Sequence, residues 1–150
     1  MAKKTKEPTV PTVRLTQNRV VTVYKVLLRI KALRAQLPAL LSRDLYRLRL
    51  ALTPLWGWQL EQEEAALAAC GGAVTPEGVI VFSDDPADGA PEMGKGRSEY
   101  IRRAMELAQT ETDVEIGTVA LPIKMDLGLV PGLTLSDDDL TALEGIIDCE

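Results

Sequence analysis

Residues 41–52, LSRDLYRLRLAL, decide the fold of this chain. Leucines stand at positions 41, 45, 48 and 52, in steps of four, three and four, which is the spacing of one face of an α-helix. Ser42 is a suitable N-cap, because its hydroxyl can accept a hydrogen bond from the backbone of the first turn. The segment therefore predicts a long amphipathic helix that packs its leucine face against another element.

The residues before this segment predict the helix that it packs against. Thr16 or Asn18 is suited to cap a helix that runs to about Leu37, and its apolar positions follow helical spacing: Val20, Val23, Tyr24, Leu27, Ile30 and Leu37. Pro38 separates the two helices, which most simply form an antiparallel hairpin. Residues 10–15 alternate apolar and polar side chains, which predicts an edge strand, and residues 1–9 are expected to be a flexible tail.

The residues after the segment predict a break and a third helix. Pro54 and Gly57 are expected to kink or interrupt the second helix. An Ala-rich helix is then predicted over residues 59–70, with Gly71 and Gly72 as its stop signal.

The chain changes character after residue 73. Val74 and residues 79–82 flank a Thr-Pro-Glu-Gly turn, which predicts a β-hairpin. We expect a mobile loop over 83–97, a helix from Ser98 to about 109, a strand over 114–121 that pairs with the hairpin, and a last helix from Ser136 to about 147. The fold class is therefore α+β, with a basic helical hairpin and a kinked Ala-rich helix followed by a small antiparallel sheet and two further helices. One domain covers residues 10–150, with 10–72 mainly helical and 73–150 mixed.

Composition places the chain among globular proteins. Apolar residues make up 46% and charged residues 26%, so disorder throughout the chain is excluded. The basic N-terminus is not followed by an apolar signal region, and no apolar stretch approaches the length of a membrane span. We expect a cytoplasmic protein with no membrane partner, whose Cys70 and Cys149 stay reduced.

Charge divides the chain into two unlike halves. Residues 1–58 have twelve Lys and Arg against two acids, a net charge of +10, whereas residues 59–150 have five against twenty, a net charge of −15. Such asymmetry marks either an anion-binding half or two halves that neutralise each other within one chain or between two copies. We favour mutual neutralisation.

The residue types present argue against catalysis. The chain has no histidine, which removes the commonest general base and most zinc sites. Residues 89–95, GAPEMGK, have the spacing of a phosphate-cradling loop, but Gly96 stands where that motif needs a hydroxyl for Mg²⁺. Lys95 and Arg97 remain candidates for contact with an anion. We expect no enzyme activity, no cofactor and no metal.

The candidate binding surface is a basic face on the predicted hairpin. Lys25 and Arg29 lie one turn apart on the first helix, and Arg43 and Arg47 repeat that arrangement on the second. Aromatic side chains near these cations add candidates for ligand or partner contact: Tyr24, Tyr46, Trp56 and Trp58. A partner of this face would be anionic. The sequence pI of 4.9 argues against nucleic acid.

The layout of the chain resembles small bacteriophage and prophage proteins of the DUF1617-like type. The resemblance covers most of residues 13–147 and rests on a short first strand (Val13-Arg14-Leu15), the Leu- and Arg-rich helical pair, a Glu-rich stretch and the spacing of residues 114–116, 133–136 and 139–144. It implies a virus-encoded accessory protein in an infected bacterium, and it assigns no functional residue.

Three binding functions follow from these observations. The first is a non-catalytic accessory protein that forms a homo-oligomer or binds a host protein. The second is a counter-defence protein that sequesters a small anionic ligand, a nucleotide, among arginine and aromatic side chains. The third is a component of the virion or of its assembly.

Overall fold

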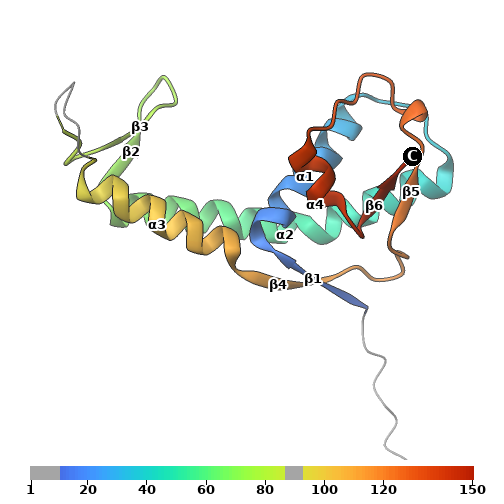
Figure 1. Cartoon of the computed structure of the whole chain (residues 1–150), viewed down its shortest axis with the longest axis horizontal. Coiled ribbons are helices and arrows are strands. Elements are labelled where there is room, and N and C mark those ends of the chain that lie inside the picture. The colour runs from blue at the N-terminus through green and yellow to red at the C-terminus, as the bar shows by residue number, and fades with distance from the viewer. Residues whose placement is uncertain (1–10, 87–92) are drawn as a thin grey trace, which may run out of the picture.

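The computed structural model describes residues 11–86 and 93–150, and over these residues the chain has an α+β fold (Figure 1). In this part of the chain, four α-helices accompany three two-stranded sheets. The elements, in chain order, are β1 (Thr12–Thr16), α1 (Gln17–Ala32), α2 (Ala39–Ala69), β2 (Gly72–Val74), β3 (Ile80–Phe82), α3 (Lys95–Gln109), β4 (Glu111–Glu115), β5 (Ile123–Met125), the 3-10 turn η1 (Leu127–Leu129), α4 (Asp137–Leu143) and β6 (Ile147–Cys149). No described helix is long and apolar enough to span a membrane.

Helix α2 runs through the whole molecule and joins two unequal parts (Figure 1). Its first half packs with α1, β4 and β5, and α4 covers another side of α1. We call this part, residues 11–58 and 110–150, the body. The second half of α2 lies beside α3 and ends at the β2–β3 hairpin. We call these residues, 59–86 and 93–109, the arm.

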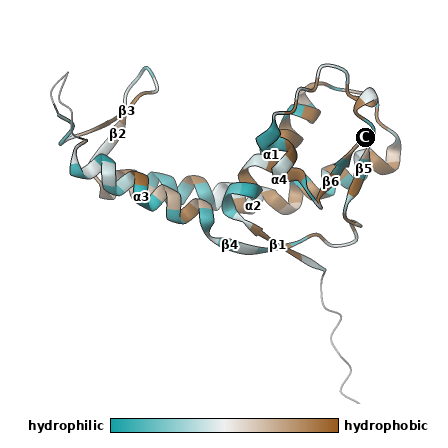
Figure 2. Ribbon diagram, in the orientation of Figure 1, coloured by the Kyte–Doolittle hydropathy of each residue, from teal (hydrophilic) through white to brown (hydrophobic). Residues whose placement is uncertain are grey.

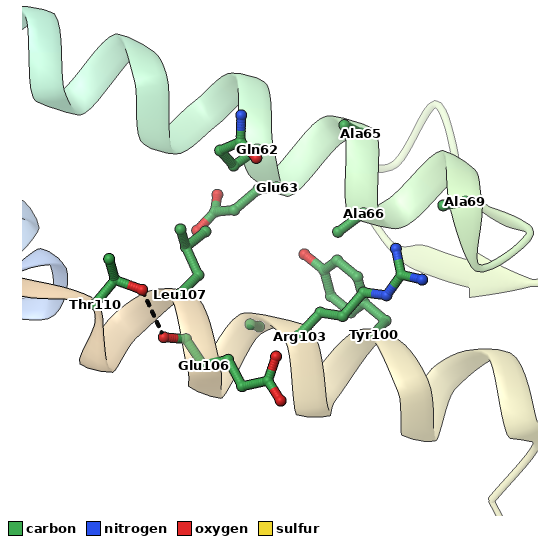
Figure 3. Close-up of a pocket in the computed structure, with 11 residues that line it drawn as sticks. Gln62, Glu63, Ala65, Ala66, Ala69, Tyr100, Arg103, Glu106, Leu107 and Thr110 are labelled. Carbon is green, nitrogen blue, oxygen red and sulfur yellow. Dashed lines mark hydrogen bonds between the residues drawn. The ribbon is translucent and has the colours of Figure 1, made fainter.

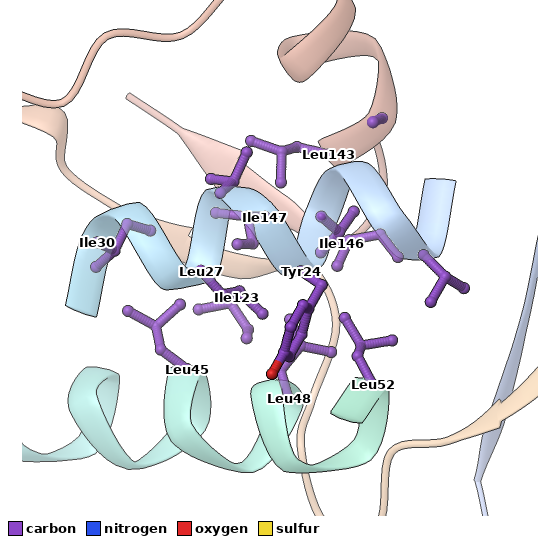
Figure 4. Packing of buried hydrophobic residues seen from close by; sticks show 14 of the residues in the cluster. Tyr24, Leu27, Ile30, Leu45, Leu48, Leu52, Ile123, Leu143, Ile146 and Ile147 are labelled. Carbon is purple, nitrogen blue, oxygen red and sulfur yellow. The ribbon is translucent and has the colours of Figure 1, made fainter. Parts of the chain in front are cut away.

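The core of the body confirms the predicted helical hairpin of α1 and α2 and the leucine face of α2 (Figure 4). Leu45, Leu48 and Leu52 are buried against α1, and the C-terminal segments cover the helix pair from the other side. The buried side chains from α1 and these segments include Val20, Val23, Tyr24, Leu27, Ile30, Ile123, Leu143, Ile146 and Ile147. Burying one such side chain fully stabilises the fold by about 1.5–3 kcal/mol. The leucine face is thus filled by the chain's own residues.

Helix α1 begins as predicted and ends earlier than predicted. The Thr16 hydroxyl accepts a hydrogen bond from the backbone N–H of Arg19 at 3.3 Å, which confirms Thr16 as the N-cap. The predicted end at Leu37 is wrong, since α1 stops at Ala32. Arg34 adopts a left-handed backbone conformation with φ of 49°, and the following residues reverse the chain so that α2 can pack back on α1.

The predicted interruption of α2 at Pro54 and Gly57 is wrong. The helix is continuous from Ala39 to Ala69, so the predicted separate helix over 59–70 is its second half. The predicted N-cap at Ser42 is also wrong, because α2 begins three residues earlier and Pro38 stands at its cap position. Pro54 removes one backbone hydrogen bond, but its side chain is exposed, where water can satisfy the freed carbonyl. The buried residues on either side of Pro54, Leu52 and Gln59, hold both flanks in register. The predicted stop is confirmed, since Gly71 takes a φ of 73° just after the helix.

Strand pairing is partly as predicted. The β2–β3 hairpin forms around the expected turn, with Gly78 at φ 83°. The strand predicted over 114–121 is instead β4, and it pairs antiparallel with β1 rather than with the hairpin. The start of α1 explains this pairing, because the Gln17 N–H donates to the Thr110 carbonyl at 2.7 Å and fixes the end of α3 beside β1.

The last predicted helix is shorter than expected. Ser136 caps α4 as predicted, in a reciprocal capping box with Asp139. The helix ends at Leu143 rather than near Ile147, because Gly145, at φ 75°, turns the chain into β6. Strand β6 then pairs with β5 in parallel, so the small sheets are not all antiparallel as predicted.

Some of the charge asymmetry is neutralised within the body. Arg14 pairs with Glu111 at 2.9 Å, and Arg29 pairs with Asp139 at 2.8 Å. The Arg19 guanidinium donates to the carbonyl oxygens of Ala142 and Glu144 at the end of α4. Cations from the basic half therefore meet acids and carbonyls of the acidic half in the same chain.

Asp139 makes the stability of the body depend on acid pH. Its pKa lies below its ordinary value, chiefly because the Arg29 side chain donates to it and also because the Ser136 N–H does so. A lowered folded pKa stabilises the fold above the unfolded value of about 3.9, and this stabilisation is lost as the pH falls through the folded pKa. We expect Asp139→Asn to lower the free energy of unfolding at pH 7 by about 1 kcal/mol or less.

Urea unfolding at pH 7 and at a series of acid pH values tests this expectation. The variant and the parent chain should differ at pH 7, and the difference should shrink as the pH falls through the folded pKa of Asp139. Asp137→Asn, in the same first turn of α4, is the matched control and should stay close to the parent at pH 7. An equal loss for both variants would contradict the role of the Arg29 contact.

Candidate functional site

One stacked group joins α1 to α2, and it consists of Tyr24 and Lys25 from α1 and Trp56 from α2. The Tyr24 and Trp56 rings lie 5.3 Å apart with an interplanar angle of 28°, and the Lys25 ammonium lies 5.7 Å from the Trp56 ring centroid. Tyr24 is buried in the core (Figure 4), so its predicted contact with a ligand gives way to packing within the chain. Trp58, two residues after Trp56, is 40% exposed.

The cations of the predicted basic face do not converge on one site. Arg29 donates to the Thr134 carbonyl and to Asp139, whereas Arg47 donates to the Thr118 hydroxyl at 2.8 Å. Arg43 lies 3.4 Å from its neighbour Asp44. Lys25 and Arg29 line a groove of about 540 Å³ whose opposite wall is Ser136 with Asp138 and Asp139. The groove therefore has walls of both signs, and an anionic ligand would meet carboxylates there.

Lys95 and Arg97 lie in the first turn of α3, which begins before the predicted cap at Ser98. The predicted mobile loop over 83–97 is thus partly helical, and its residues 87–92 lie outside the described residues. The Gly96 N–H donates to the Asp84 carboxylate at 2.9 Å, where a phosphate-cradling loop would hold its phosphate. A Cβ at Gly96 would stand 2.7 Å from that carboxylate, so glycine permits the approach. The chain's own Asp84 therefore takes the place of an anionic ligand.

Arg97 is committed to the same end of the arm. Its guanidinium donates to both oxygens of Asp85 and to the Ile80 carbonyl, and it lies 4.9 Å from the Phe82 ring centroid. The Arg97 hydrogen bond and the Phe82 N–H lower the pKa of Asp85. Arg97 thus fastens the β2–β3 hairpin to α3, and its Nε and Nη2 donors are used within the chain.

The arm keeps most of its apolar side chains on its surface. Helix α3 has no buried residue in the part of the chain that the structure describes, and the described arm buries only Gln59, Leu67 and Phe82. Large apolar side chains that remain exposed on the arm are Leu60, Val74, Val79, Val81, Met93, Ile101 and Met105. Figure 2 shows hydrophobic positions interspersed with hydrophilic ones along α3. Ile101 and Met105, which lie one helical turn apart on α3, are both exposed to solvent.

A groove of about 490 Å³ lies between α2 and α3 (Figure 3). Small side chains from both helices line much of it, and Tyr100 and Leu107 supply larger apolar surfaces. Glu63, Arg103 and Glu106 stand at the polar part of its lining. The alanines involved are Ala65, Ala66, Ala69 and Ala104. Because alanines cannot reach across the interval between the helices, apolar side chains from another molecule can occupy it.

The charges of the arm differ between its two helices. Residues 59–69 have three glutamates and no cation, a net charge of −3, whereas Lys95–Gln109 has four cations and two acids, a net charge of +2. Within α3, Glu99 pairs with Arg102 and Arg103, and these two hydrogen bonds lower the pKa of Glu99 to about 2. In the sequence, this surface was indicated only by the apolar spacing of Ile101 and Met105. That spacing is the same whether a helix packs on the core or forms an interface.

Comparison with protein-family models, with curated proteins and with solved structures finds no match to this chain. The resemblance to DUF1617-like phage proteins stays a prediction.

Proposed function

We propose that this chain is a non-catalytic binding protein whose arm pairs with the arm of a second copy. The observation that supports it most directly is the exposure of α3, whose Ile101 and Met105 are 40% and 59% exposed while the helix buries no residue of its own. A helix of this length is marginal in water without tertiary packing, and so is an isolated two-stranded hairpin. The arm therefore gains stability when another surface covers it.

Charge complementarity favours a second copy as the partner. If α3 of one copy lies against the outer half of α2 of the other, a helix of net charge +2 meets a segment of net charge −3, twice in one symmetric interface. The exposed ion pairs within α3 are weak, so their cations can re-pair with the second copy at little cost. Two such arms make a four-helix bundle, in which Ile101 and Met105 of each copy are covered by the arm of the other copy.

The leucine face of α2 does not compete for this role. Leu45, Leu48 and Leu52 are covered by the chain's own α1 and C-terminal segments, so they have no surface left for a second copy. In the setting that the DUF1617-like resemblance implies, the protein is a phage-encoded accessory factor that works as this assembly.

The double variant Ile101→Glu, Met105→Glu tests the proposal. The parent chain should have twice its 16.3 kDa mass at micromolar concentration, measured by light scattering after size-exclusion chromatography. The variant should be a monomer, with self-association weakened about 100-fold or more, because two apolar contacts are replaced by desolvated charges. Both side chains are exposed in the single chain, so circular dichroism should show that the variant keeps its helices.

Leu40→Glu is the matched control, because Leu40 is 67% exposed on the body and far along α2 from the arm. This variant should remain a dimer. A monomeric parent chain would contradict the proposal, and so would a double variant that still formed a dimer.

A further inference from the structure

We infer that a cleft at the connection between α1 and α2 binds a small organic phosphate. The cleft has a volume of about 230 Å³. Its cationic and polar lining comprises Lys31, Arg34, Arg49, Ser42 and Tyr46. This site lies in the body, and it does not depend on the pairing of the arms.

The charge of the cleft is of one sign. Three cations and no carboxylate line it, in contrast to the groove beside Asp138 and Asp139. None of the ion pairs between described residues involves Lys31, Arg34 or Arg49. Neighbouring cations repel one another, so an anion among them is favoured. Arginine also suits the geometry of phosphate, because its planar guanidinium donates two parallel hydrogen bonds.

The backbone at Arg34 gives an independent reason to assign a role to its side chain. Residue 34 is the first residue after the α1 cap, its N–H donates to the Lys31 carbonyl, and its φ is 49°. Glycine is the usual residue at this left-handed position, because a side chain there is strained. An arginine at this position costs conformational energy. The same residue lines the cleft, so a role of its guanidinium in binding would explain why the strained backbone is kept.

The rest of the lining fits an apolar or aromatic portion of the ligand. Leu27, Ile30 and Leu45 are buried residues of the core that form part of the cleft wall. Tyr46 is 51% exposed, and the Arg49 guanidinium lies 5.3 Å from its ring centroid. An exposed ring with an adjacent arginine offers a face for stacking. The volume suits a small molecule, and the net charge of −5 on the whole chain disfavours a long polyanion.

The dipole of α1 explains only part of this cluster. A cation in the last turn of a helix interacts favourably with its carbonyl end, which accounts for Lys31. Arg49 belongs to α2, three turns or so after that helix begins, and no helix end lies beside it in sequence. The cleft collects cations from two helices and their connection.

Calorimetric titration with phenyl phosphate, adenosine monophosphate and inorganic phosphate tests the assignment. The parent chain should bind the two organic phosphates in a salt-sensitive way and inorganic phosphate at least tenfold more weakly. Arg34→Gly should weaken binding of phenyl phosphate about tenfold or more, and glycine suits the left-handed backbone, so this variant should fold at least as well as the parent. Arg49→Gln should weaken binding to a similar extent.

Arg43→Gln is the control on the same helix as Arg49, because Arg43 does not line the cleft. This variant should bind phenyl phosphate as tightly as the parent chain does. All these variants should keep the mass of the parent chain in solution, which separates this site from the arm. No binding of either organic phosphate at millimolar concentration would overturn the assignment. Equal affinity for inorganic phosphate, or full binding by Arg34→Gly and Arg49→Gln, would overturn it as well.

Discussion

Replacing Leu48 by alanine is expected to lower the free energy of unfolding by about 2–5 kcal/mol. Leu48 is fully buried in the middle of the leucine face of α2, between Leu45 and Leu52 and against α1 (Figure 4). Three carbons are lost from a closely packed site that can collapse only in part, so a transfer cost and a cavity cost add. A loss of this size is a large fraction of the 5–15 kcal/mol that is typical of whole domains.

Leu50→Ala isolates burial as the cause. Leu50 is on the same helix and is 49% exposed, so both substitutions raise helix propensity equally while only one empties the core. The Leu50 variant should lose about 0.5 kcal/mol or less. Urea unfolding, followed by circular dichroism and tryptophan fluorescence at one protein concentration, gives both values. Similar losses for the two variants would show that the helix pair is not the core of the body.

Replacing Phe82 by alanine is expected to unfold the tip of the arm while the body stays folded. Phe82 is 5% exposed, and its ring lies 5.6 Å from the Tyr100 ring and beneath the Arg97 guanidinium. A buried phenylalanine replaced by alanine costs about 3–5 kcal/mol. The described arm buries only Gln59 and Leu67 besides Phe82, so few apolar contacts remain to hold the hairpin on α3. The β2–β3 hairpin should separate from α3.

Hydrogen exchange followed by mass spectrometry locates the effect. Amides of residues 72–82 and 95–103 should lose protection, whereas those of α1 and of residues 39–56 should keep it. Val81→Ala is the control, because Val81 is the neighbouring strand residue and is 40% exposed. Loss of protection throughout the molecule would show that the arm and the body unfold as one unit.

Signals that act within a few residues predicted many of the local elements, although the caps expected at Ser42 and Ser98 lie inside α2 and α3. The hydroxyl caps at Thr16 and Ser136 are side-chain-to-backbone hydrogen bonds over three residues, and both are present. Gly71 and Gly78 take the positive φ values that their turns require. The leucine spacing of α2 predicted its buried face, because helical periodicity fixes which side chains share a side.

Features that depend on residues far away in the sequence could not be predicted from local signals. Pro54 and Gly57 have poor helix propensity, yet buried residues before and after them keep α2 continuous. Strand β4 has no sequence feature that selects β1 over the hairpin, and the contact between Gln17 and Thr110 makes the choice. The Gln17 side chain adds to this junction, since it is fully buried and donates to the Leu55 carbonyl at 3.0 Å.

The candidate site residues also fall into two groups, those that the sequence suggested and those that only the fold brings together. The aromatic and basic residues singled out from sequence, such as Tyr24 and Arg97, are used largely for packing and for ion pairs within the chain. The cleft residues Lys31, Arg34 and Arg49 have no shared spacing along the chain, and the reversal after α1 brings them together.

The sequence by itself determined the α+β class, the helix pair around Leu48, the β2–β3 hairpin and the caps at Thr16 and Ser136, because periodicity and capping act between residues within one or two helical turns. The tertiary structure alone decided that α2 continues past Pro54, that β1 pairs with β4, and that α3 leaves Ile101 and Met105 exposed. An apolar stripe has the same spacing whether its own chain or a second copy covers it. The tertiary fold decides whether the same chain covers the stripe or leaves it exposed for a second copy.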